Sequence, residues 1–142
     1  MTLDPDAGVR PWDRLVIDDV DLPADLPARR RAAVTEARAH VEPVSPDGRG
    51  AMGLRRYGAG CVALVLRGRF ERCSRELLRA LADELPSAAC RELVVDLSGL
   101  DGCDPVLVRA LARLRIRCLT REARVELYDL PPALAAELGL RP

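Results

Sequence analysis

The side chains with the widest chemical repertoire are five cysteines and one histidine. The cysteines are separated by 12 to 17 residues and form no CxxC pair, so their spacing indicates neither a zinc site nor a secreted disulfide framework. His40 is the only histidine and has no neighbouring cysteine, which disfavours a histidine-based catalytic site. We therefore expect no metal, no cofactor and no enzyme activity. The five cysteines are Cys61, Cys73, Cys90, Cys103 and Cys118, and most of them are predicted to be small core residues.

Two local patterns permit an enzymatic interpretation, and both are weak. Cys103 lies beside a predicted helix N-terminus, an environment that lowers the pKa of a thiol, but burial as a small filler is the favoured reading. The turn Gly58-Ala59-Gly60 precedes a strand rather than opening a helix, and the chain contains no lysine for a Walker-type site. These glycines are therefore expected to form a turn, and no nucleotide site is predicted.

The composition is that of a single domain without a strong charge bias. The 142 residues are 49% hydrophobic and 31% charged, which is enough for one ordinary core. All 22 basic residues are arginine, which we attribute to codon bias, and they balance 22 acidic residues. A net charge of zero disfavours nonspecific binding to nucleic acid or to an anionic membrane. With no apolar run of membrane-spanning length and no signal-peptide pattern, we expect a cytoplasmic protein.

Charge divides the chain into two regions. Residues 1–50 carry 7 arginines and 10 acids, a net charge of −3, whereas residues 51–142 carry 15 arginines and 12 acids, a net charge of +3. We expect residues 1–50 to be an N-terminal extension, partly helical or disordered, with a short helix over 28–41 capped by Asp25 that packs on the domain or forms a tail. Residues 42–53, with two prolines and three glycines, predict a linker.

The remaining chain predicts an α/β domain over residues 53–140. Residues 54–57 and 61–66 indicate a hairpin, 92–97 a central strand buried on both faces, and 124–128 a half-buried strand. Helices are expected over 74–85, from 105 onward, and over 131–138, with a loop over 98–103. The order β-β-α-β-α-β-α predicts a small mixed sheet of about four strands with helices packed against it.

The helix that begins at residue 105 has the clearest local signals. Asp104 followed by Pro105 predicts an N-cap and a first helical residue. Four apolar residues repeat at intervals of four, three and four, and so predict the buried face: Leu107, Leu111, Leu114 and Cys118. The opposite face carries Arg109, Arg113 and Arg117, one turn apart. Like charges at this spacing repel unless solvent or an acidic partner compensates them, and we favour solvent.

This order of elements, with the run Val94-Val95-Asp96-Leu97-Ser98-Gly99-Leu100 before Asp104, resembles the STAS domain of anti-sigma factor antagonists. Gly68-Arg69-Phe70 is similar to the family's Gly-Glu-Leu turn, and Asp96-Leu97-Ser98-Gly99 matches its Asp-Leu-Ser-Gly. Arg109-Ala110-Leu111 falls where similar residues follow the family's switch motif. The resemblance covers about residues 53 to 140 and implies the STAS fold.

The resemblance also identifies a degenerate phosphorylation motif. In the family, a loop ends in Asp-Ser-Ser-Gly at a helix start, where a partner kinase that is also an anti-sigma factor phosphorylates one serine and so switches binding. The corresponding residues here are Asp104-Pro105-Val106-Leu107, so the acceptor positions hold Pro105 and Val106. We favour helix capping as the role of Asp104. Ser98 is the nearest hydroxyl, and local hydrogen bonding is favoured over phosphorylation there.

We therefore expect a noncatalytic regulatory protein-binding module that works without phosphorylation. The implied partner is an anti-sigma factor with serine kinase activity or another STAS protein. The alternative is a structural STAS-like subunit of a homo- or hetero-oligomeric signalling assembly, and a homodimer is one form of it. The expected partner-binding residues lie in the loop and the first turns of the helix after it: Ser98, Asp101, Asp104, Pro105, Val106, Leu107, Arg109 and Arg113.

Overall fold

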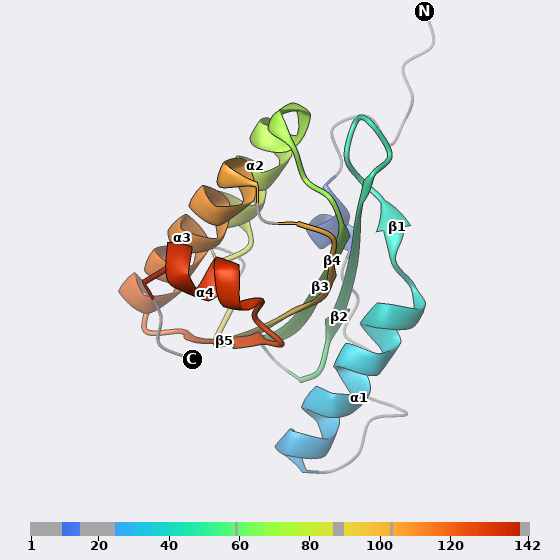
Figure 1. The fold of residues 1–142 in the computed structure, drawn as a ribbon. Helices are drawn as coiled ribbons and strands as arrows, with labels where there is room; N and C mark the ends of the chain where they lie inside the picture. Colours follow the sequence, from blue (N-terminus) through green and yellow to red (C-terminus); the bar gives the residue numbers. More distant parts are fainter. Residues whose placement is uncertain (1–9, 15–24, 59, 87–89, 103, 140–142) are drawn as a thin grey trace, which may run out of the picture.

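Five strands form one mixed sheet in the spatial order β1 to β5, and four α-helices pack against it (Figure 1). The structure is a computed structural model that describes residues 10–14, 25–58, 60–86, 90–102 and 104–139. The first two strand pairs are antiparallel, and β3–β4 and β4–β5 are parallel. The strands are β1 (Glu42–Pro43), β2 (Gly50–Arg56), β3 (Cys61–Gly68), β4 (Glu92–Leu100) and β5 (Arg124–Tyr128).

Helices cover both faces of the sheet. α2 (Arg75–Glu84), α3 (Pro105–Thr120) and α4 (Pro132–Glu137) lie on one face, and α1 (Leu26–Ala39) lies on the other (Figure 1). Because successive strand residues point to opposite faces, alternate residues of the central strands divide between two cores. Leu64 and Val95 belong to the main core under α2 and α3, whereas Ala63 and Val94 contact α1.

The contact between α1 and the sheet is close because its inward residues are small. Ala33, Val34 and Ala37 are buried on the face that meets β2 and β3. A Cβ atom at Gly53 of β2 would overlap the carbonyl oxygen of Ala37, so this position has no room for a side chain. The short helix expected near residues 28–41 is confirmed, and Asp25 caps it by accepting the Ala28 amide at 2.9 Å.

The segment before the hairpin differs from its expected structure. Residues 42–53, predicted as a linker, contain β1 and the first part of β2, so the sheet has five strands rather than about four. The prolines and glycines of this segment do form a turn, but the turn is confined to the residues between β1 and β2. The Ser45 hydroxyl donates to Asp47 at 2.6 Å and accepts the Gly50 amide at 2.8 Å, which allows strands to form on both sides of the turn.

The strand expected over residues 92–97 is longer in the structure. β4 continues through Leu100, so residues 98–100 belong to the sheet and not to a loop. The extension pairs with the end of β3 after a register shift between Val65 and Arg67. The remaining elements confirm the predicted order, with the hairpin closed by Gly58 and Gly60, both at positive φ.

A short 3-10 helix, η1 (Pro11–Arg14), joins the N-terminal region to the main core. Trp12 is buried there, and its indole N–H donates to the Glu84 carboxylate at the end of α2, with 3.3 Å between Nε1 and Oε1. None of the helices in the described ranges has the length and apolar character needed to cross a membrane.

Candidate protein-interaction site

The predicted functional residues gather at the edge of the sheet where the parallel strands β3, β4 and β5 end. In α/β sheets this edge commonly holds the functional site, because the loops that follow the strands converge there. The Asp101 amide donates to the Gly68 carbonyl at 2.8 Å, which fixes the start of the loop after β4 against the end of β3. The loop then leads to the first turn of α3.

Asp104 is the N-cap of α3. Its carboxylate oxygen Oδ1 accepts the Val106 amide at 2.9 Å, and Pro105 occupies the first helical position. The capping role predicted for Asp104 is therefore confirmed. One donor of the helix start already faces a fixed negative charge, and residues 104–108 contain no hydroxyl group.

Six of the eight expected binding residues lie at this edge with exposed or half-buried side chains. Ser98, Asp101, Pro105 and Arg109 are exposed, while Asp104 and Val106 are half-buried. These six residues are called the candidate interaction site below.

Leu107 was expected among the binding residues, and the structure contradicts this. Its side chain is only 1% exposed and belongs to the main core, because it starts the apolar face of α3 that continues through Leu111 and Leu114. A partner cannot contact it without unfolding the helix. Charge at this position would disrupt the core, so the exposed Pro105 and Arg109 are the appropriate positions for testing binding.

The arginine face of α3 is partly paired rather than only solvated. Arg113 donates to both oxygens of Asp83 on α2, at 2.6 and 3.3 Å, and the Nε of Arg117 lies 3.2 Å from the same carboxylate. The Arg113 hydrogen bond holds the pKa of Asp83 below its usual value. The preference for solvent at Arg113 and Arg117 is therefore wrong, and an acidic neighbour compensates them.

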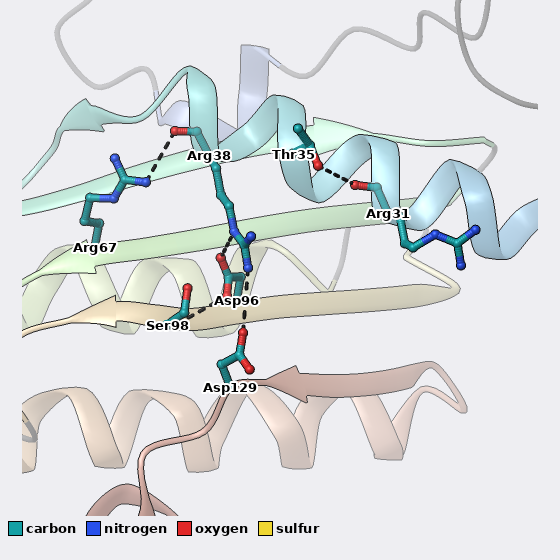
Figure 2. A network of polar contacts seen from close by, with 7 residues as sticks. All are labelled: Arg31, Thr35, Arg38, Arg67, Asp96, Ser98 and Asp129. Carbon is teal, nitrogen blue, oxygen red and sulfur yellow. Dashed lines mark hydrogen bonds and ion pairs between the residues drawn. The ribbon is translucent and has the colours of Figure 1, made fainter.

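A buried carboxylate lies directly beside the candidate interaction site. Asp96 in β4 is 1% exposed and faces α1, where the Arg38 Nε lies 2.6 Å from its Oδ2 (Figure 2). The backbone amide of Ser98 donates to the other oxygen of Asp96 at 3.2 Å. Arg38 also reaches Asp129 after β5, with 3.7 Å between Nη2 and Oδ2. One arginine thus connects α1 to the middle of β4 and to the residue that follows β5.

These contacts keep Asp96 ionised despite its burial. Burial would raise the pKa of Asp96, but the hydrogen bonds from Arg38 and Ser98 and the positive charge of Arg38 outweigh it, so the pKa is below its usual value. Figure 2 shows Arg67 of β3 beside the same network, where its guanidinium donates to the Arg38 carbonyl at 3.5 Å. The local hydrogen bonding expected for Ser98 is present, with a carboxylate as the partner.

A second ion pair joins α1 to the first residue of β4. Arg30 pairs with Glu92, which is buried. The two arginines are eight residues apart on a helix, about 12 Å at the α-helical rise. The two acids are four residues apart on a strand, about 13 Å at the strand rise. These lengths match, so α1 has a charge pair to β4 near each end of the helix, with apolar contacts to the sheet between them.

Sequence reasoning did not identify these charge pairs, although a signal was present. Glu92 and Asp96 flank the apolar residues Leu93, Val94 and Val95, and as even-spaced neighbours they share one face of a strand predicted to be buried. A buried carboxylate needs a cation, and residues 28–41 contain four arginines to which the sequence assigned no role. The spacing of Glu92 and Asp96 indicates that these carboxylates need cationic partners, but it does not indicate which helix supplies them.

The described cysteines and histidine show no catalytic arrangement. Cys90 and Cys118 are buried as predicted, and burial raises the pKa of their thiols to about 12 and about 11. Cys61 is half-buried, and Cys73 is exposed and does not fit the core prediction. Cys103 lies outside the described residues. His40 is exposed at the end of α1, where Nδ1 lies 3.0 Å from the Glu36 carbonyl oxygen.

Comparison with known proteins identifies the domain. A family model described as Mlab, STAS domain matches residues 55–140, which is more than half of the chain. No curated protein matches the chain. Two crystal structures of Mglu, one of them in its native form, are 31% and 27% identical over 56% and 52% of this chain, with TM-scores of 0.45 and 0.43. The chain spans only 19% and 22% of their lengths. Through residues 55–140 the chain belongs to the STAS domain family, and it is a regulatory or binding module of the STAS type.

Proposed function

We propose that this chain is a noncatalytic regulatory module that binds a protein partner through the candidate interaction site without being phosphorylated. The partner is an anti-sigma factor with serine kinase activity or another STAS protein, and the chain acts in the cytoplasm in the regulation of transcription. Binding itself is the regulatory event. Control comes from the amount of the chain or from competition for the partner.

The observation that carries this proposal is the capped first turn of α3. The Asp104 carboxylate already accepts the Val106 amide, and the two positions where the family carries serines hold Pro105 and Val106. A helix start favours negative charge through its free amides and its dipole. Because the serines are absent, no phosphoryl group can be added beside Asp104 in this turn, so the site has one electrostatic state where a phosphorylated relative has two.

Phosphorylation is tested with a serine kinase that modifies a STAS domain containing Asp-Ser-Ser-Gly. After incubation of the full chain with this kinase and ATP, intact mass and peptide mapping should show no phosphoryl group on residues 98–107. The double variant Pro105→Ser, Val106→Ser serves as the positive control for access to the turn. Phosphate on Ser98 of the unmodified chain would contradict the proposal.

Binding is tested by capture of partners from a lysate of the source organism, followed by mass spectrometry. The unmodified chain should enrich an anti-sigma factor or another STAS protein, and the double variant Pro105→Glu, Arg109→Glu should lose it. Arg121→Glu reverses one exposed charge near the other end of α3 and should retain the partner. Equal capture by all three proteins would exclude the candidate interaction site as the binding surface.

One observation favours the alternative of a structural subunit in a larger assembly. Ile116 and Leu119 are 63% and 54% exposed and are neighbours three residues apart on α3, and adjoining exposed apolar side chains are a feature of contact surfaces between subunits. A second copy of the chain is the occupant tested. Sedimentation at increasing concentration should then show a dimer that Ile116→Glu converts to a monomer. A monomer at all concentrations rules out this alternative.

A further inference from the structure

A groove of about 280 Å³ lies between the first halves of α2 and α3, next to the candidate interaction site. Four arginines line it, two from each helix: Arg75 and Arg79 from α2, and Arg109 and Arg113 from α3. In each pair the residues are four positions apart and therefore lie one turn apart on the same helix face. The groove, called the arginine groove below, thus has a row of guanidinium groups along each wall.

The charge of these walls is only partly neutralised by the protein itself. Asp83 pairs with Arg113 and Arg117, and the charge of Arg79 also lowers its pKa. Arg75, Arg79 and Arg109 form no direct ion pair within the part of the chain that the structure describes. Over its 16 residues α3 carries four arginines and no acidic residue, and two of the four line the groove. An otherwise neutral chain therefore concentrates positive charge at one groove, and the complementary ligand is acidic.

The floor of the groove is apolar. Leu78, Val106 and Ala110 lie between the two arginine rows. None of the groove residues is aromatic, so the groove lacks the stacking surfaces with which proteins bind single-stranded nucleic acid. An apolar strip between two cationic rows instead fits a peptide segment that presents apolar side chains along its centre and carboxylates at its sides.

We propose that the arginine groove binds an acidic, amphipathic helical segment of the protein partner. The inference rests on the proposed function, because it specifies the chemistry of the partner that contacts Val106 and Arg109. Carboxylates of the segment pair with Arg75, Arg79 and Arg109, and its apolar side chains contact Leu78 and Ala110. The loop residues of the candidate interaction site then determine which acidic segment is accepted.

The probe is a synthetic amphipathic peptide of about four helical turns, with leucine on one face and glutamate on both sides of it. Titration into the full chain, followed by NMR chemical shifts, should move the signals of Leu78, Val106 and Ala110. The double variant Arg75→Glu, Arg79→Glu should weaken binding about tenfold or more, since each reversal replaces attraction with repulsion. The control Arg31→Glu, Arg121→Glu reverses two exposed arginines outside the groove and should bind within about twofold of the unmodified chain.

Three results would overturn the inference. The first is equal weakening by the groove and control variants, which indicates nonspecific charge attraction. The second is equal binding of a peptide with glutamine in place of glutamate. The third is tighter binding of a single-stranded oligonucleotide to the same residues.

Partner capture distinguishes this inference from the proposed function. Loss of the captured partner in Pro105→Glu, Arg109→Glu together with full retention in Arg75→Glu, Arg79→Glu would leave the proposed function intact and overturn the inference. Loss in both variants supports both. A partner unaffected by either variant refutes the proposed function, and the peptide titration alone then decides whether the groove takes acidic segments.

Discussion

Asp96 illustrates how a single carboxylate inside a sheet requires a specific partner. Burial of an unpaired charge costs far more than a folded domain can tolerate, so the residue must be neutralised or paired. Arg38 supplies that pairing from outside the sheet, while the Ser98 amide satisfies the second oxygen. The same contacts include Ser98, a residue of the candidate interaction site near the end of β4. Stability and the geometry of the candidate interaction site are therefore linked at this residue.

Replacing Arg38 with alanine should destabilise the protein by roughly 2 kcal/mol. Removal of one partner from a fully buried pair costs about 3 to 5 kcal/mol, and the value is lower here because the Arg38 side chain is 43% exposed. Urea unfolding monitored by circular dichroism measures the effect. Arg31→Ala, an exposed arginine of the same helix, is the matched control. Equal unfolding midpoints for the two variants would show that the pair is not stabilising.

The pKa of Asp96 predicts how stability changes with acid. Because the pKa of the folded state is below that of the unfolded state, about 3.9, the stabilisation is complete above that value. It is lost as the pH falls through the folded-state pKa. Asp96→Asn should be less stable at neutral pH and should show a shallower loss of stability below about pH 4. Unfolding midpoints measured from pH 2 to 7 test this, and parallel curves for the two proteins would contradict it.

At the scale of elements, the close packing of α1 on the sheet depends on a glycine in β2, Gly53. Gly53→Ala should destabilise the protein by about 1 to 3 kcal/mol, because the new methyl group would overlap the Ala37 carbonyl and move α1 away from β2. Hydrogen exchange should then be faster at the amides of α1 than at those of α3.

Gly99→Ala is the matched control for this substitution. A Cβ there would meet only the Arg67 side chain, at 3.1 Å, and a flexible side chain can move. Uniformly faster exchange in both helices of the Gly53 variant would indicate global loss of stability and no specific role in placing α1.

Elements with local signals were predictable from the sequence, and those that depend on distant contacts were not. Asp104-Pro105 and Asp25 specify helix starts through contacts two or three residues away, so both caps could be predicted. The strands around residues 42–53 were missed because prolines and glycines there mark a turn, while the pairing that makes strands comes from β3 for β2 and from β2 for β1. Leu107 was placed at the surface by analogy with a motif, although its own apolar spacing indicated the core.

At the scale of the whole molecule, α1 completes the domain rather than extending it. Its removal uncovers Tyr57, Ala63 and Val94 on the outer face of the sheet. A chain of residues 41–142 should therefore be less stable than a chain of residues 25–142 by on the order of 3 kcal/mol or more, from lost apolar burial alone. Thermal unfolding of the two chains, which differ mainly in α1, measures this. Equal thermal unfolding midpoints for the two chains would show that the sheet is equally stable without α1.

The position of Trp12 gives the molecule a built-in optical reporter. It is the only tryptophan, and it is buried where η1 meets the end of α2. Its fluorescence therefore reports whether η1 is docked on the main core, while the circular dichroism signal follows all helices together. A red shift of the emission at lower urea than the loss of helix would mean that the N-terminal region detaches before the sheet unfolds. A single coincident transition would mean that residues far apart in the sequence form one cooperative unit.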